Sequence, residues 1–263
     1  MARVASRLKQ RTGKPAPPSE IRASARGPSL SKSPRSTKKW DAYRRLGGQS
    51  PFPHFPRPPP AECRLAHLIL ADLHGDRDPL AGNAMAADGM DRPCVFPDVL
   101  DGLLYGALCQ ATNENNAIRQ VSNMKHVCGD WTNYEAIVRN GDSALQQALQ
   151  CDGLHVRKSQ LAMEISQQVK AAHGTYSLSH LPHAEDDDAM KELLSYNGVG
   201  PNTASCVLAL TLQRSRFVVD TRIHRITGYL GWRPKEATAE QARAHLECKI
   251  PDQHNVAQVG DEA

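Results

Sequence analysis

Apolar residues recur at helical spacing through most of the chain, from residue 97 onward. Asp98 precedes a run whose apolar positions, three and four residues apart, share one face of a helix, and an aspartate there is a good N-cap. Those positions are Leu100, Leu103, Leu104, Ala107 and Leu108. A second run, from about Lys158 to Ala172, ends at His173-Gly174, which is typical of a helix stop. Both runs predict helices with one buried face.

Further helix starts are marked by capping residues. Thr132 and Glu135 have the spacing of a capping box. Asp142 or Ser143 caps the next predicted helix, "SALQQALQ". Residues 185–196, "EDDDAMKELLSY", place carboxylates in a first turn, where the helix dipole favours them. With no convincing strand and no internal repeat, the predicted fold class is all-α.

Composition excludes some classes of protein. The chain has 263 residues, of which 40% are hydrophobic and 23% charged. No run approaches the roughly 18 apolar residues of a membrane span, so we expect no membrane partner. The seven cysteines are odd in number and scattered, without a CxxC pair. This pattern favours reduced thiols inside a cell, and it offers neither a zinc site nor a cysteine-held iron–sulfur site among sequence neighbours.

Charge is distributed unevenly along the chain. Residues 1–45 hold 13 Lys/Arg and 2 Asp/Glu, whereas the other 218 residues hold 19 and 26. The basic excess therefore belongs to an N-terminal arm and not to a face of the folded body. Such arms often contact nucleic acid, but they also occur as solubilising disordered ends. Both interpretations stay open.

Composition shifts divide the chain into four regions. Residues 1–46, rich in Ser, Pro, Arg and Lys, are expected to be a disordered basic tail. Residues 47–96 form a proline-rich spacer with one peripheral helix at about Ala61 to Leu73. Residues 97–252 form the helical domain, and 253–263 a polar tail.

Two targeting signals compete in the basic tail. "SKSPRSTKK" could serve as a nuclear localisation patch. Alternatively, Met1, Val4, Ala5 and Leu8 lie on one helical stripe with basic residues elsewhere, which suits a mitochondrial transit peptide. We expect the nucleus, with the mitochondrion as the alternative.

The stretch "NGVGPNTASCVLAL", residues 197–210, predicts a turn between two helices. Gly198 and Gly200 let the turn take positive φ and approach a ligand closely, and Pro201 suits the first position of the next helix. The N–H groups at that helix start have no intrahelical partner and form an anion site. A DNA phosphate would fit there, with Val199 packed into the underside of the turn. A lone GxG of this kind is more often a plain helical corner.

The segments on both sides of this turn give it a functional interpretation. "LLSYNGVGPNTASCVLAL" and "FVVDTRIHRITGYLGW" resemble the helix-hairpin-helix and Gly/Pro-Asp (HhH-GPD) superfamily of base-excision DNA glycosylases, the endonuclease III-like group. "LLYGALCQATNENNAIRQ" and "CDGLHVRKSQLAMEI" are similar to earlier segments of that family. The resemblance covers residues 97–252 and is most specific across 193–232. It implies a two-lobed helical fold.

The resemblance assigns roles to single residues. Gly198, Val199 and Gly200 would form the hairpin that grips a DNA phosphate, and hairpin carbonyls often hold a monovalent cation in this family. Gln110 matches the position that fills the gap left by an extruded nucleotide. Asp220 matches the catalytic aspartate.

Asp220 has a second interpretation from its sequence neighbours. It stands between an apolar run and a helical pattern, so it is also a good N-cap, and the two roles can coexist. A fixed carboxylate can stabilise the positive charge that develops on the sugar when an N-glycosidic bond breaks. The base must first leave the stack, which is easiest for a damaged or mismatched base.

The chain departs from the family at two positions beside these residues. Bifunctional relatives use a lysine amine that forms a Schiff base with the sugar, and Asn202 stands at that position. An amide cannot form this adduct, so lysine-dependent strand cleavage is not expected. Arg222 stands where relatives commonly carry histidine. It and Thr203 are candidate DNA contacts.

The last residues depart from the family as well. Cys248 is isolated, so we predict neither the four-cysteine iron–sulfur cluster of endonuclease III nor another cofactor, apart from the hairpin cation. The sequence after Asp252 is polar, and the second lobe is expected to be incomplete. Incomplete cover over a helical core would expose apolar surface.

The predicted function is a monofunctional DNA glycosylase that acts, as a monomer, on duplex DNA with a damaged or mismatched base. Two alternatives stay open. One is a catalytically silent paralogue that only binds DNA, and the other is a truncated gene product that folds poorly.

Overall fold

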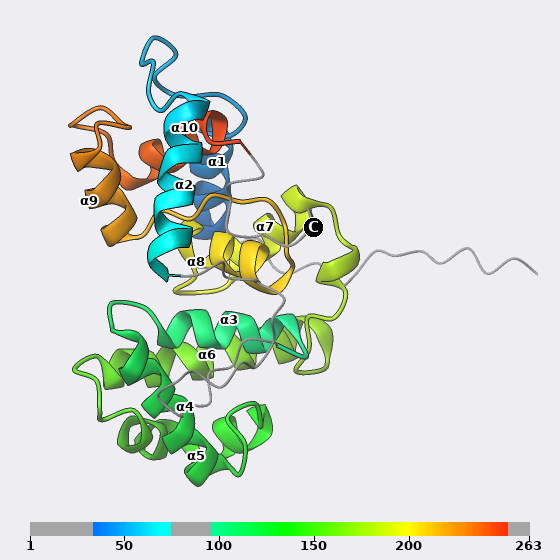
Figure 1. Cartoon of the computed structure of the whole chain (residues 1–263). Coiled ribbons are helices and arrows are strands. Elements are labelled where there is room, and N and C mark those ends of the chain that lie inside the picture. Colours follow the sequence, from blue (N-terminus) through cyan, green and yellow to red (C-terminus); the bar gives the residue numbers. More distant parts are fainter. Residues whose placement is uncertain (1–33, 75–95, 252–263) are drawn as a thin grey trace, which may run out of the picture.

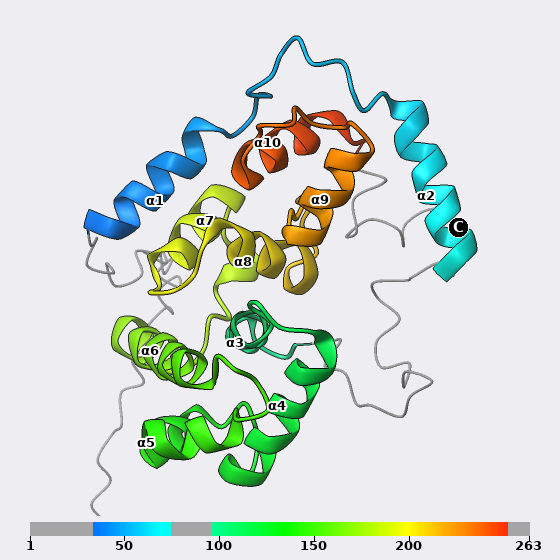
Figure 2. The ribbon, with the colours of Figure 1, turned by 90° about the vertical axis from the view of Figure 1, so that its left-hand side faces the viewer.

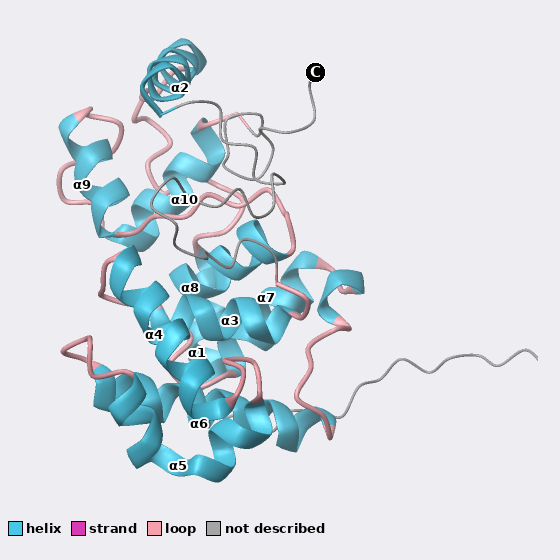
Figure 3. Ribbon diagram, turned by 60° about the horizontal axis from the view of Figure 1, so that its bottom comes forward, coloured by secondary structure: helices cyan, strands magenta, loops and turns pink. Residues whose placement is uncertain are grey.

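The computed structural model describes residues 34–74 and 96–251, and these residues are helical, without a strand (Figure 3). The predicted all-α class is confirmed. The tail residues 1–33, with the proposed transit stripe, and the polar tail 253–263 lie outside the described residues. The helices are α1 (Pro34–Arg45), α2 (Pro60–His74), α3 (Val99–Leu108), α4 (Glu114–Cys128), α5 (Tyr134–Ala148), α6 (His155–His173), the 3-10 helix η1 (Leu181–His183), α7 (Asp186–Ser195), α8 (Pro201–Cys206), the π-helical segment η2 (Val207–Thr211), α9 (Thr221–Tyr229) and α10 (Ala239–Lys249).

The helices form two lobes, as predicted. Helices α3 to α6 make up one lobe, and α7 to α10 with α1 and α2 make up the other (Figures 1 and 2). Helix α3 packs against both α8 and η2 where the lobes meet. One large apolar core runs through this junction, because α1 and α3 to α8 all contribute buried side chains to it. The apolar face predicted for residues 100–108 is fully buried in that core.

A second, much smaller cluster supports the far side of the second lobe. Its buried members are Cys63, Val219, Trp232, Ala242, Leu246 and Ile250. Helix α2 packs on it with one edge only, and five of its apolar side chains are at least half exposed. These are Leu65, Leu68, Ile69, Leu70 and Leu73. Among the described helices, none is long and apolar enough to cross a membrane.

The prediction that residues 1–46 are disordered is wrong for residues 34–45, which form α1. Trp40 and Tyr43 lie three positions apart on this helix, stack with ring centroids 6.0 Å apart, and are buried in the large core. Their burial stabilises a segment whose charge density alone suggested a solvated chain. Six of the nine residues of the proposed nuclear localisation patch therefore lie in a packed helix.

The boundary drawn at residue 97 does not separate a spacer from a domain. Before α2, which confirms the predicted peripheral helix, the proline-rich segment packs on α10. His245 Nε2 lies 2.7 Å from the Arg57 carbonyl, and its Nδ1 lies 2.6 Å from Ser50 Oγ. Phe52 and Phe55 meet the same ring edge-on. The folded unit thus begins no later than Pro34.

Helix starts were predicted correctly at Asp98 but not at Thr132. Asp98 caps α3 through a capping box. At α5 the cap is Asn133, whose side chain accepts from Ala136 N, so the predicted cap was one residue early. Gly141, with φ 77° and ψ 176°, kinks α5 where a separate helix start was expected. The predicted stop at Gly174 is confirmed, with a left-handed φ of 73°.

Candidate DNA-binding and catalytic site

The turn between α7 and α8 requires glycine at Gly198 for two reasons. Its φ is +75°, which disfavours other residues, and a Cβ there would lie 2.2 Å from Leu161 Cδ1. Val199 is 1% exposed and packs into the large core, as predicted. Val199 can therefore contact a ligand only through its backbone. The turn is thus pinned to the core at its base.

Gly200, by contrast, faces open space. It is the N-cap of α8 with an extended φ of −104°, and a Cβ there would meet no atom within 4 Å. No side chain caps α8, whereas Asp98 and Asp220 cap α3 and α9. Pro201 at the first helical position removes one N–H that would otherwise need a partner. The uncapped helix start leaves backbone N–H groups that an anion could accept from.

Gln110 connects this turn to the other lobe. Its Nε2 donates to Thr203 Oγ1 at 3.1 Å and reaches the Gly198 carbonyl at 3.5 Å. Thr203 is buried, so its hydroxyl fixes Gln110 and does not lie open to DNA. Ala111, the next residue, has a φ of +51°, a conformation that costs about 1–3 kcal/mol in a residue other than glycine. The chain therefore carries backbone strain beside the glutamine.

A buried ion pair holds the end of α3 that carries Gln110. Lys158 Nζ lies 2.6 Å from Asp152 Oδ2 and 2.5 Å from the Leu108 carbonyl, with both charged side chains at most 6% exposed. Burial raises the pKa of Asp152, but hydrogen bonds from Lys158 and Thr112 outweigh it and hold that pKa well below its usual range. Lys158 does not supply positive charge to DNA, because its ammonium points into the protein.

Asp220 is the N-cap of α9, as the sequence predicted. Its Oδ1 accepts from Ile223 N at 2.7 Å, and its side chain remains exposed. Its carboxylate is close enough to the Cys206 thiol of α8 to affect its titration. Burial, then the charges of Cys109 and Asp220, raise the pKa of Cys206 to about 11. The start of α9, the end of α3 and α8 therefore converge here.

Asn202 lies one turn before Cys206 on α8, on the same side of the helix. Its Oδ1 is buried and finds no hydrogen-bond donor among the described residues. An unpaired buried acceptor costs about 1–3 kcal/mol, which makes it a place where water or a ligand is readily held. Arg222 lies in the first turn of α9 with an exposed side chain.

Helix α1, missed as an element, adds cations to the hairpin. Arg35 lines a hollow of about 320 Å³ beside Asn197 and Gly198, together with Arg157 of α6. Lys39 donates to backbone carbonyls of the hairpin itself, at 2.8 Å for the Val199 oxygen. The sequence signal for this helix was the spacing of Trp40 and Tyr43, three positions apart. It was missed because basic residues surround these two aromatic residues.

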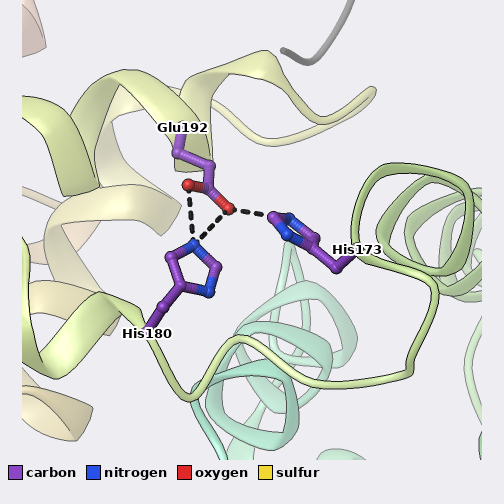
Figure 4. Close-up of side chains that lie close together, drawn as sticks. All are labelled: His173, His180 and Glu192. Atoms are coloured by element: carbon purple, nitrogen blue, oxygen red, sulfur yellow. Dashed lines mark hydrogen bonds and ion pairs between the residues drawn. The ribbon is translucent and has the colours of Figure 1, made fainter. Parts of the chain in front are cut away.

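A separate polar cluster lies behind the hairpin. Glu192 of α7 binds His180 Nε2 at 2.9 Å and His173 Nε2 at 3.1 Å, and Tyr196 also donates to it (Figure 4). The three ligand atoms of the histidines and the glutamate lie within 4.8 Å of one another, a set that could hold a divalent metal ion. Because each of them already has a hydrogen-bond partner, the cluster is explained as a polar link between α6 and α7.

Comparisons with known proteins agree with this geometry. The chain is 32% identical over 226 residues to "Putative DNA glycosylase At3g47830" of Arabidopsis thaliana, covering 79% of this chain and 76% of that protein. It is 29% identical over 117 residues to "DNA glycosylase/AP lyase ROS1" of the same plant, covering 44% of this chain and only 8% of ROS1. Endonuclease III of Thermotoga maritima is 26% identical over 150 residues, covering 57% and 64%.

The fold is also similar to solved structures. An endonuclease III trapped as a covalent intermediate with DNA superimposes with a TM-score of 0.56 at 15% identity, covering 75% of this chain and 82% of that one. No model of a known protein family matches the chain. The extent of the first similarity, together with the shared fold, shows that the chain belongs to the HhH-GPD superfamily of DNA glycosylases, in its endonuclease III-like group.

Proposed function

We propose that the protein is a base-excision DNA glycosylase that binds duplex DNA with a damaged or mismatched base and hydrolyses the N-glycosidic bond with Asp220. The observation that carries this proposal is the convergence of three groups. The hairpin before α8, Gln110 on Thr203 of α8 and the Asp220 carboxylate near Cys206 of α8 all border this one short helix. Family membership supports the same chemistry.

Binding would use the hairpin and the glutamine for different tasks. A phosphate oxygen accepts from the N–H groups at the start of α8, a contact that positions DNA without reading its sequence. Arg35 and Arg157 beside Gly198 attract neighbouring phosphates. Gln110 enters the space that the extruded nucleotide leaves. Extrusion costs a few kcal/mol, least for a damaged or mismatched base, and this difference contributes to selectivity.

Asp220 would stabilise the electron-poor sugar that forms as the base departs. Its carboxylate is oriented because the Ile223 N–H donates to one of its oxygens. Water then attacks the sugar carbon and loses a proton to the carboxylate, and the base leaves with the electron pair of the broken bond. The unpaired Asn202 Oδ1, one turn from Cys206, is suited to accept a hydrogen bond from this water.

Strand cleavage by a lysine amine is not part of the proposal. ROS1 is named as an AP lyase, but Asn202 here has no basic lone pair with which to form a Schiff base. Lys191 and Lys235 are exposed residues of α7 and of the loop after α9, outside the position that matches the family lysine. We therefore propose base release without strand scission.

The test is base release from a panel of lesion-bearing duplexes, followed by alkali or by no treatment. Strand breaks are expected only after alkali. Asp220→Asn should lower the rate by at least about 100-fold. Because asparagine caps helices as well as aspartate does, the melting temperature should hardly change. Asp130→Asn, at another exposed carboxylate that accepts from a backbone N–H, is the matched control and should be fully active.

The outcomes separate the alternatives. Equal rates for wild type and Asp220→Asn would remove Asp220 from the mechanism. Tight, salt-sensitive DNA binding with no base released from any duplex would identify a silent DNA-binding paralogue. Strand breaks without alkali would refute the proposal of a monofunctional enzyme.

A further inference from the structure

Three hairpin carbonyls converge on one ammonium group. Lys39 Nζ lies 2.8 Å from the Val199 oxygen and 3.2 Å from the oxygens of both Leu194 and Tyr196. Leu194 is in the last turn of α7, Tyr196 is its C-cap, and Val199 is in the turn itself. A lysine ammonium has three donors and no acceptor, so donors and acceptors match one to one.

The lysine is held in place from behind. Helix α1 packs against α7, and Trp40 and Tyr43, one and four positions after Lys39, are buried in the large core. The Arg243 guanidinium of α10 covers the Tyr43 ring at 4.5 Å. Lys39 is itself half-buried, and burial, followed by the charge of Arg35, lowers its pKa. This is a fixed side chain and not a mobile surface lysine.

The hairpin needs a positive charge at this point. The last carbonyls of a helix have no intrahelical partner and form the negative end of its dipole. The Val199 carbonyl of the turn points to the same position as the last carbonyls of α7. The sequence resemblance implied a monovalent cation on such carbonyls, but here the Lys39 ammonium already occupies their meeting point. The donor set of this chain therefore does not fit an additional metal ion.

The peptide unit between Val199 and Gly200 links this site to the DNA side. A trans peptide points its C=O and N–H in opposite directions. Because the carbonyl is directed at Lys39, the Gly200 N–H points away from Lys39. The space beside Gly200 is open, since a Cβ built there would meet no atom within 4 Å. The positive charge behind the peptide also polarises it in the direction that strengthens the N–H as a donor to an anion.

We propose that Lys39 is a built-in cation that replaces a monovalent metal ion in the hairpin and positions the Gly200 N–H for a DNA phosphate. This inference rests on the proposed DNA-binding function. Lys39 is a positioning residue, since it acts through the hairpin backbone. Two consequences follow. The native protein should bind DNA equally well with any monovalent salt, and removal of the lysine should leave a cage of three carbonyl oxygens that a metal ion can fill.

The experiment measures the affinity for a duplex that contains a tetrahydrofuran abasic-site analogue, in KCl, NaCl and choline chloride at one ionic strength. Wild type should bind equally in all three salts, within about twofold. Lys39→Met keeps the apolar stem but removes the charge, and in choline it should bind about tenfold more weakly, as expected for a lost charge-assisted hydrogen bond. KCl or NaCl should restore most of that loss, because choline is too large for the cage.

Lys38→Met is the matched control, because Lys38 is the exposed neighbour on the same helix. It should weaken binding equally in all three salts, or not at all. A wild type that needs K⁺ or Na⁺ would overturn the proposal. So would a Lys39→Met protein that binds like wild type in choline, or one whose loss is the same in every salt.

A DNA-free arm separates this proposal from the proposed function. The melting temperature of Lys39→Met should be higher in KCl than in choline chloride, whereas that of wild type should not differ. If the protein binds no duplex, the proposed function fails, and the melting temperatures still decide whether Lys39 stands in for a metal ion. Equal melting temperatures of Lys39→Met in the two salts would reject it.

Discussion

The hairpin lies at the start of α8 and the candidate catalytic carboxylate lies near its last residue, Cys206, but different parts of the molecule support them. The hairpin is held by the large core, by Lys39 of α1 and by Gln110, just after α3. Asp220 begins α9, a helix with Thr227 as its single buried residue. Three apolar residues at the end of that helix are exposed by 42% or more: Ile226, Tyr229 and Leu230.

The segment that leads to Asp220 shows where the support changes. At its beginning, Arg214 donates to the Leu181 and Ala184 carbonyls and pairs with Asp186 at 2.8 Å, so it is fixed to the large core. At its end, Val219 packs into the small cluster. The Asp220 carboxylate therefore lies between the large core and the small cluster. Because the two cores support different groups, mutations in the large core should affect both DNA binding and catalysis, whereas mutations in the small cluster should affect catalysis first.

The largest effect is expected from Lys158→Met, which removes one partner of the buried ion pair in the large core. Asp152 would be left charged and unpaired, at a cost of about 3–5 kcal/mol in unfolding free energy. The Leu108 carbonyl would lose its donor, and the end of α3 would no longer hold Gln110 in place. Chemical denaturation should report the lost stability, and both DNA binding and base release should fall.

The same pair gives the stability a pH dependence with a definite sign. Because the folded protein lowers the pKa of Asp152, its contribution is complete above the unfolded value of about 3.9 and is lost as the pH falls further. Wild type should thus lose stability on acidification below about pH 4, and Lys158→Met should lose less. The double variant Lys158→Met/Asp152→Leu should regain most of the stability at neutral pH. No recovery in the double variant would mean that the pair itself is not the cause.

A smaller effect is expected from Leu246→Ala, in the core of the small cluster. Leu246 is fully buried in α10, and its truncation should lower the free energy of unfolding by about 2–3 kcal/mol. This is at the low end for leucine, because the few residues of the small cluster can relax around the cavity. Amide hydrogen exchange should accelerate in α9 and α10 alone. Base release should fall while duplex binding stays within about threefold of wild type, since the hairpin rests elsewhere.

Leu104→Ala, at a fully buried position of α3, is the matched control in the large core. It should accelerate exchange across both lobes and weaken binding together with base release. If Leu246→Ala weakened binding as much as Leu104→Ala does, the two supports would not be independent.

The sequence identified the parts of the site whose signals are local. Glycines around a turn, a proline at a helix start and an aspartate before a helical run each act on their neighbours, so Gly198, Pro201 and Asp220 were correctly predicted to lie at a turn, a first helical position and an N-cap. Gln110 came from the resemblance alone, because an isolated glutamine at a helix end has no distinctive pattern.

The sequence could not identify the groups that act over long distances. Lys39 reaches carbonyls 155 to 160 residues away, and its helix was hidden by the charges around two buried aromatic residues. The burial of Lys158 has no signal in the sequence, because lysines usually lie at the surface. Its partner Asp152 stands in a loop whose course no periodicity reveals.

The smallest change in stability, below about 1 kcal/mol, is expected from Asn202→Lys, at a half-buried position near an exposed helix start. The change in chemistry should nevertheless be large, because it places an amine one turn from Cys206 and hence near Asp220. The amine can attack the sugar aldehyde of an abasic site and lose water to form an imine, which borohydride reduces to a stable crosslink. Covalent complexes with abasic-site DNA should therefore be trapped for this variant and not for wild type.

Asn197→Lys is the control for proximity alone, since Asn197 is an exposed residue of the same turn. It adds an amine near the DNA but away from Asp220, and should trap poorly. Efficient trapping by wild type would mean that another amine performs the reaction and that Asn202 does not limit it. Failure of Asn202→Lys to trap, with DNA binding intact, would mean that α8 and the start of α9 do not face the same sugar. In that case the contrast between a firmly held hairpin and a lightly supported carboxylate would not describe one active site.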